Sequence, residues 1–293
     1  MSVTELTHFV GIDWSGAKGS RHAGLAVAVC GAGVGAPTVV EPPSGGRAWS
    51  RSECADWIAA GMGLPKRSRA LVGIDSAFSM PFVDKGSYVP DAKLPNNARA
   101  LWPVLEAACD GAADLYGGPF VEAHSDFYLK TGAKGPQFER RMRVCEQRAI
   151  DSGAGPCESV FHLIGPSQVG LSGLSTMRML NQLAGEPHVS VWPYDPPATA
   201  GTTLVEIYAA AFAKLGGHRG KMRGLEALNA VLTSLQSDRI AHMPATAAGG
   251  EHAADALVTA AGLRMISSER KYWHPPALST MVRHTEGWIF GVI

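Results

Sequence analysis

Residues 10–18, V-G-I-D-W-S-G-A-K, change abruptly from apolar to polar at Asp13. Residues 71–77, L-V-G-I-D-S-A, make the same change at Asp75. Each apolar half has the length and residue types of a buried strand, and each of these strands ends on a carboxylate. The fold therefore depends on how the two Gly-Ile-Asp strands lie relative to one another.

The segments around these motifs predict how the strands are connected. Short apolar runs at 8–12, 23–29 and 38–41 are separated by turns, which predicts an antiparallel meander of three strands. A helix is expected at 52–62, followed by a fully apolar strand at 70–75. A strand–helix–strand order implies a right-handed crossover, which places the second Gly-Ile-Asp strand parallel to an earlier one.

The remaining chain is predicted to form further helices and strands around this unit. Strands are expected at 159–164, 189–192 and 203–207, and helices at 95–116 with a bend or break near Pro103, 137–151, 225–237 and 251–266. No low-complexity linker bounds residues 80–170, so we interpret this stretch as an insertion within one domain, 1–293. The helix at 137–151 alternates arginine with glutamate, which indicates a solvated face or an interface.

Composition excludes several classes of protein. The 293 residues are 46% hydrophobic and 18% charged, as in ordinary soluble globular proteins, and the formal net charge is zero. The net charge therefore does not indicate nucleic acid or a membrane as a partner. Five scattered cysteines without C-x-x-C spacing favour reduced thiols. With no apparent signal peptide or membrane span, a cytoplasmic location is expected and no membrane partner.

The two aspartates predict a cation site if their strands are parallel neighbours. In open α/β sheets, ligands gather outside the carboxyl ends of the strands, where Asp13 and Asp75 would converge. Two adjacent carboxylates repel one another unless a cation lies between them or one takes a proton. A hard divalent cation such as Mg²⁺ prefers oxygen ligands of this kind. The alternative is that each aspartate only caps the turn after its strand.

Two further acids are candidates for the same site. Glu206 lies within the apolar strand pattern T-L-V-E-I-Y, where an unpaired carboxylate is costly; its alternative is the exposed face of an edge strand. Asp255 opens a largely apolar helix, E-H-A-A-D-A-L-V-T, with Glu251 one turn earlier on the same face. The alternative for Asp255 is an ordinary first-turn acid favoured by the helix dipole.

Taken in order, the motifs G-I-D-W-S-G, G-I-D-S-A-F-S-M-P, S-V-F-H-L-I-G, V-W-P-Y-D, V-E-I-Y and H-A-A-D-A-L-V-T-A-A resemble the domain of unknown function 429 family, described as predicted ribonuclease H-like nucleases. The resemblance runs from about residue 9 to residue 265. It implies an α/β fold: a ribonuclease H-like mixed β-sheet flanked by helices, with a helical insertion after the fourth strand. It also implies that Asp13, Asp75, Glu206 and Asp255 take the acidic metal-binding and catalytic positions.

The expected function is then a metal-dependent nuclease, hydrolysing phosphodiester bonds of nucleic acid with Mg²⁺ or Mn²⁺. Two ions roughly 3.5–4 Å apart can activate the attacking water and stabilise the leaving oxygen. Asp13 is expected to bridge both ions, and Asp75, Glu206 and Asp255 to complete their coordination. Whether the substrate is DNA, RNA or a small phosphoester stays open.

Other residues are candidates for binding substrate. His252 could shuttle a proton or touch phosphate, and Trp14 could stack on a base. The basic segment at 216–224 could contact a phosphate backbone. The full set of these candidates is Trp14, Ser125, Asp126, Arg219, Lys221, Arg223 and His252. Their alternatives are a surface histidine, a packed tryptophan and a solvated loop.

Two other classes of function stay open. An actin-like or sugar-kinase-like ATPase or phosphotransferase shares this strand order, and G-I-D-W-S-G resembles the first phosphate loop of such enzymes. Those enzymes usually carry two copies of the unit, whereas both Gly-Ile-Asp segments here fit within one copy. A catalytically inactive ribonuclease H-like interaction module is the other alternative. The sequence has no G-x-S-x-G elbow and no P-loop, which disfavours a serine hydrolase and a Walker-type ATPase.

Overall fold

The computed structural model describes residues 6–165, 169–220, 222–244 and 249–293. The strands are β1 (His8–Asp13), β2 (Ala26–Gly31), β3 (Thr38–Val39), β4 (Arg69–Asp75), β5 (Leu129–Lys130), β6 (Ala133–Lys134), β7 (His162–Leu163), β8 (Val189–Trp192) and β9 (Gly201–Glu206). The α-helices are α1 (Arg51–Ala59), α2 (Ala98–Ala108), α3 (Gly118–Ala123), α4 (Val144–Asp151), α5 (Val169–Leu183), α6 (Ala209–Leu215), α7 (Leu225–Ser234), α8 (Gly249–Ile266), α9 (Arg270–Trp273) and α10 (Thr280–Thr285). Short 3-10 helices lie at η1 (Ala113–Leu115) and η2 (Ser125–Phe127).

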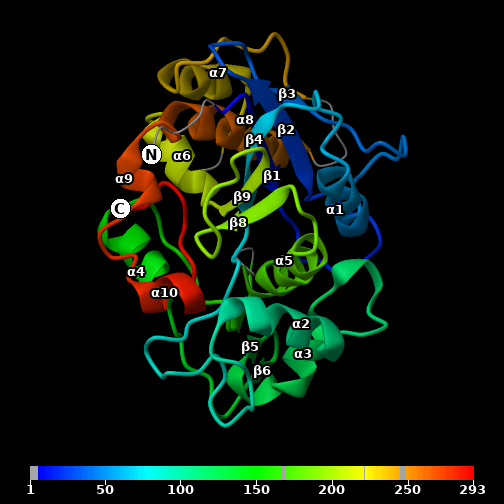
Figure 1. The fold of residues 1–293 in the computed structure, drawn as a ribbon, viewed down its shortest axis with the longest axis vertical. Coiled ribbons are helices and arrows are strands. Elements are labelled where there is room, and N and C mark those ends of the chain that lie inside the picture. The colour runs from blue at the N-terminus through cyan, green and yellow to red at the C-terminus, as the bar shows by residue number, and fades with distance from the viewer. Residues whose placement is uncertain (1–5, 166–168, 221, 245–248) are drawn as a thin grey trace.

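A six-stranded mixed sheet in the order β3-β2-β1-β4-β9-β8 forms the centre of the fold (Figure 1). β1 and β3 each run antiparallel to β2, which confirms the expected meander. β4 runs parallel to β1, β9 to β4 and β8 to β9, so the two Gly-Ile-Asp strands are parallel neighbours as expected. In this register Asp13 is the direct partner of Asp75. Both aspartates therefore stand at the same edge of the sheet.

Alternation along the strands divides the core between the two faces of the sheet. Ile12 and Ile74 belong to a cluster with residues of α1, α2 and α5, whereas Phe9 and Leu71 belong to a cluster with residues of α8. α8 packs against β1 and β2 at very short range, because Gly11 has no side chain. A Cβ atom on Gly11 would lie 2.2 Å from the Ala256 carbonyl oxygen. This close contact fixes the position of α8 against the sheet.

Much of residues 80–165 lies below the sheet in Figure 1. This segment contains α2, α3, α4 and a small three-stranded sheet in the order β6-β5-β7. Several local expectations were wrong here. The helix expected at 137–151 begins only at Val144, and the strand expected at 159–164 is reduced to β7. The helix expected at 95–116 covers only α2, which runs through Pro103 and ends at Ala108.

The four arginines of 137–151 do not share one solvated face, because Arg140 and Arg148 are exposed and the other two are not. Arg141 and Arg143 are buried, and both bind acceptors within the protein. Arg141 donates to the Asp84 carboxylate and to carbonyl oxygens that include those of Pro81 and Tyr88. The segment before α4 is thus extended because its arginines satisfy buried acceptors.

Several helices did not follow from the sequence patterns. They are α3, α5, α6, α9 and α10. α5 is the most consequential, because it packs against α1 and α2 across one face of the sheet. Among the described residues, no helix has both the length and the apolar character needed to cross a bilayer.

Candidate functional site

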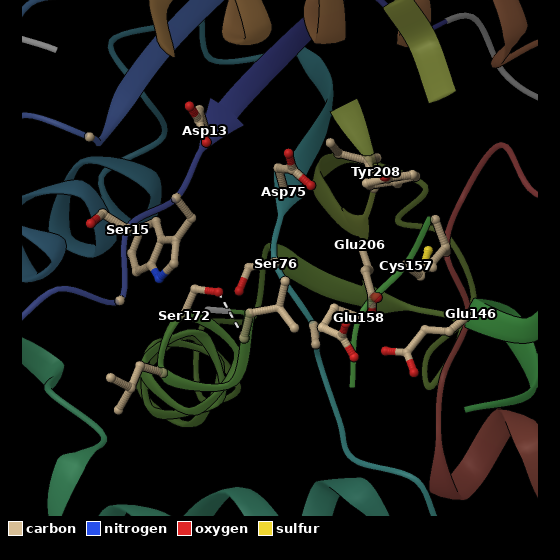
Figure 2. Close-up of a pocket in the computed structure, with 18 of the residues that line it drawn as sticks. Asp13, Ser15, Asp75, Ser76, Glu146, Cys157, Glu158, Ser172, Glu206 and Tyr208 are labelled. Carbon is tan, nitrogen blue, oxygen red and sulfur yellow. Dashed lines mark hydrogen bonds between the residues drawn. The ribbon is translucent and has the colours of Figure 1, made fainter. Parts of the chain in front are cut away.

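A cleft of about 550 Å³ opens at the carboxyl ends of β1, β4 and β9 (Figure 2). One wall is the loop after β1, another is the first turn of α5, and the insertion closes the side farthest from Asp13. The polar and charged residues that line it include Asp13, Ser15, Asp75, Ser76, Arg143, Glu146, Cys157, Glu158, Ser172, Glu206, Tyr208 and His252. The sheet thus supplies one half of the cleft and the insertion the other.

Asp13 and Asp75 end adjacent parallel strands as cross-strand partners, so their side chains leave the same face of the sheet. Burial raises the pKa of the Asp75 carboxyl well above its usual value, and the nearby charges of Asp13 and Asp255 raise it further. The Ala209 backbone N–H donates to Asp75 and opposes this rise in pKa. Burial also raises the pKa of Asp13, although His252 opposes it. The carboxylates of Asp13 and Asp75 repel one another, and this repulsion favours binding of a proton or a cation between them.

His252 lies at the mouth of the cleft and contacts Asp13. Its Nδ1 atom is 2.6 Å from a carboxylate oxygen of Asp13, while 47% of the histidine side chain stays exposed. The hydrogen bond to Asp13 raises the pKa of His252, and burial partly opposes this. A Cβ atom on Gly24 would lie 3.6 Å from the Nε2 atom of His252, so that ring nitrogen faces the loop before β2. His252 therefore lines the cleft beside Asp13.

Asp255 lies one turn further along α8 from His252 and is half-buried. It does not line the cleft, but its charge acts on groups that do. Asp255 raises the pKa of both Asp75 and His252. The structure therefore brings Asp13, Asp75 and Asp255 together on the α8 face of the sheet.

Glu206 is in a different situation from the three aspartates. It pairs in register with Ile74, so its side chain leaves the opposite face from Asp75. Arg143 binds both of its carboxylate oxygens, one of them at 2.8 Å, and the Phe78 backbone N–H donates to it at 2.9 Å. Only 2% of Glu206 is exposed. Its carboxylate is a buried partner of Arg143.

Arg143 joins the insertion to the sheet through the Glu206 carboxylate and makes further contacts. Besides Glu206, it contacts Glu146 at 2.9 Å and donates to the Glu286 carbonyl oxygen at 3.1 Å. Glu286 in turn accepts from the backbone N–H groups of Phe82 and Val144. Sequence reasoning missed this cluster, because alternating arginine and glutamate suggested a surface.

A second buried arginine holds the loop that follows Asp13. Arg51 donates to the carbonyl oxygens of Ser15 at 2.7 Å and Ala17 at 3.0 Å. Asp114 fixes Arg51 in turn, by accepting from the backbone N–H groups of Arg51 and Ser52 and by binding His22 at 2.6 Å. Although burial opposes them, these contacts lower the pKa of Asp114 to about 2. No sequence motif indicated this support.

The other predicted substrate-binding residues do not join the cleft in the same way. Trp14 lines it but is buried, and its indole N–H donates to Ser175 Oγ at 2.8 Å. Ser125 and Asp126 lie in η2, outside the lining residues. In the basic segment, Arg219 is exposed and Arg223 lies 3.5 Å from Glu251. Neither of these two arginines lines the cleft. Lys221 lies outside the described residues.

The donor set fits a divalent cation in part. Asp13 and Asp75 are adjacent carboxylates with raised pKa values and Asp255 lies close by, whereas the oxygens of Glu206 are occupied by Arg143. In the described ranges of the chain, no group of three or more His, Cys, Asp or Glu side chains is already arranged to hold a metal ion.

The fold and site together define an α/β protein with a mixed sheet and an acidic cleft at the carboxyl ends of its parallel strands. No protein-family model, curated protein or solved structure matches the chain.

Proposed function

We propose that this chain is a metal-dependent hydrolase of phosphoester bonds, built on a ribonuclease H-like sheet. The observation that carries the proposal is the pairing of Asp13 with Asp75 at the ends of parallel strands, beside Asp255. The strand order, in which an antiparallel meander continues into parallel strands, supports the ribonuclease H-like part. The order of the sequence motifs supports the family resemblance.

Asp13, Asp75 and Asp255 would hold Mg²⁺ or Mn²⁺, since hard cations prefer carboxylate oxygens. The cation would supply Lewis-acid stabilisation of charge on the phosphoryl oxygens and make water a better nucleophile at neutral pH. Glu206 was the fourth expected ligand. Because it neutralises Arg143, we assign it instead to holding the insertion against the sheet.

His252 is the residue best placed to move a proton. Hydrolysis forms one P–O bond from water and breaks the ester P–O bond, so one proton must pass from the water towards the leaving oxygen. His252 binds Asp13 through Nδ1, which leaves Nε2 as the atom that would accept or return that proton. Asp13 keeps the ring oriented, as a carboxylate does for many catalytic histidines.

The test combines cleavage with metal-dependent melting. Bis(p-nitrophenyl) phosphate and a panel of nucleic acids are incubated with the protein and Mg²⁺ or Mn²⁺, beside the variant Asp13→Asn. A metal present at about 100 times its Kd stabilises the fold by about 2.7 kcal/mol, a rise of several degrees in Tm. We expect Asp13→Asn to lose both the cleavage and the metal-induced rise in Tm. Glu122→Gln, at a 74% exposed surface carboxylate, is the matched control and should lose neither.

The same experiment with ATP added as a further substrate separates the two alternatives. Binding and turnover of ATP without phosphodiester cleavage would favour a phosphotransferase. If metal changes the Tm of Asp13→Asn and of the parent equally and neither protein cleaves, the hydrolase is contradicted and an interaction module is favoured.

A further inference from the structure

The charges that line the cleft restrict what can enter it. Its carboxyl groups are those of Asp13, Asp75, Glu146, Glu158 and Glu206. Among the described lining residues the basic side chains are Arg143 and His252, and both are paired with carboxylates. An anionic ester would therefore depend on an accompanying divalent cation for its attraction to this cleft.

Among the described lining residues there is no lysine, and the arginine and histidine are already paired with carboxylates. Proteins bind nucleic-acid strands through lysine or arginine at successive phosphates and through aromatic platforms for the bases. The indole of Trp14 is buried in the core and bonded to Ser175, so it offers no open face for stacking. A further phosphate on the side of the cleft away from Asp13 would approach the carboxylate of Glu158, which repels it.

The size of the cleft fits a small molecule. About 550 Å³ lies within the roughly 300–1,000 Å³ typical of small-molecule sites. Figure 2 shows Cys157, Glu158 and Tyr208 on the side of the cleft away from Asp13. The insertion therefore limits how far a ligand can extend from the paired aspartates.

The side opposite Asp13 offers hydrogen-bond acceptors for the rest of such a ligand. Glu158 keeps 20% of its side chain exposed, although it already binds Arg140 and His162. The Tyr208 hydroxyl makes a long contact of 3.4 Å with the Pro156 carbonyl oxygen, so it can turn towards a better partner. Carboxylate and hydroxyl oxygens accept from hydroxyl or amino groups.

We propose that the cleft binds one small, nucleotide-sized phosphoester whose organic part carries hydroxyl or amino groups, and that it does not bind a polynucleotide chain. The phosphoryl group lies beside Asp13 and Asp75, and the organic part lies against Glu158 and Tyr208. This inference rests on the proposed hydrolase function, because the cation at the aspartates attracts the phosphate.

Binding to the full chain in excess Mg²⁺ tests the proposal. The small probes are adenosine 5′-monophosphate, ribose 5-phosphate and glycerol 3-phosphate. The polymers are single-stranded and duplex oligonucleotides without terminal phosphates. We expect at least one small probe to raise the Tm beyond Mg²⁺ alone and to bind measurably by calorimetry, and the polymers to do neither. The inference would be overturned if a polymer raised the Tm, or if every small probe left the Tm unchanged.

Two variants locate the binding in the cleft. Glu158→Ala and Tyr208→Phe should each weaken binding of the best small probe about fivefold or more, as expected for one lost hydrogen bond. Glu122→Gln should leave that affinity unchanged. Affinity unchanged in both cleft variants would place the ligand elsewhere and overturn the inference.

The metal-only arm keeps the two proposals distinguishable. If Mg²⁺ alone raises the Tm of the parent but not of Asp13→Asn, the metal site stands whatever the probes do. If Mg²⁺ raises neither, the hydrolase itself fails.

Discussion

Arg143 and Glu206 form a buried, two-oxygen ion pair that joins the insertion to the end of β9. Asp13 and Asp75 stand on the other face of the sheet, only one strand position from the register of Glu206. One edge of the sheet thus carries two kinds of carboxylate. The aspartates repel each other, and the glutamate is neutralised.

Glu206→Gln should destabilise the fold strongly. The substitution leaves the buried Arg143 charge with Glu146 as its remaining carboxylate partner, and breaking a buried pair from one side costs about 3 kcal/mol. Urea unfolding measures the loss. Glu139→Gln, in the exposed Lys85–Glu139 pair, is the control and should cost less than about 1 kcal/mol. Equal losses in the two variants would show that Arg143 does not depend on Glu206.

Asp114→Asn should remove a pH-dependent part of stability. The pKa of Asp114 in the fold is about 2, below its usual value of 3.8. Its contribution is therefore complete above about pH 4 and is lost as the pH falls towards 2. The free energy of unfolding of the parent should exceed that of the variant by roughly 1–2 kcal/mol near neutral pH, and this difference should become smaller at about pH 3. A gap that is constant with pH would argue against the ionised carboxylate as its source.

Gly11→Ala should destabilise the contact between β1 and α8. Its Cβ would overlap the Ala256 carbonyl oxygen and the Ala260 nitrogen, which are backbone atoms and cannot rotate away. Overpacking of this kind costs about 1–3 kcal/mol or more. Gly35→Ala, where a Cβ meets nothing within 4 Å, is the control and should change the free energy of unfolding by less than about 0.5 kcal/mol. Melting curves of the two variants measure the difference, and an equal Tm for both would contradict the prediction.

Trp14→Phe should affect stability and leave ligand affinity alone. The change removes the bond to Ser175 and leaves a small cavity, at a cost of about 1–3 kcal/mol. Affinity for adenosine 5′-monophosphate should stay within about twofold in calorimetry. A larger loss of affinity at equal folding would show that the ring stacks on the ligand.

The strand pairing at the centre could be predicted from the sequence because both Gly-Ile-Asp strands carry a strong local signal. The partners of Glu206 could not, because they depend on strand register and on a residue 63 positions away. Arg143 looked like a surface residue, since a periodic charge pattern does not reveal buried acceptors. α5, with the sequence V-G-L-S-G-L-S-T-M-R-M-L-N-Q-L, was missed because its glycines and serines weaken helix propensity, and tertiary packing decides its structure.

Glu286 has a consequence for how the chain assembles during synthesis. Its carboxylate, 1% exposed, accepts from the backbone N–H groups of Phe82, Val83 and Val144. Val83 and Glu286 are 203 positions apart, so at about 5–20 residues per second Val83 precedes its acceptor by roughly 10–40 s. During that interval the nascent insertion lacks these three bonds. The wall of the cleft is therefore completed after its floor, β1 and β4, has left the ribosome.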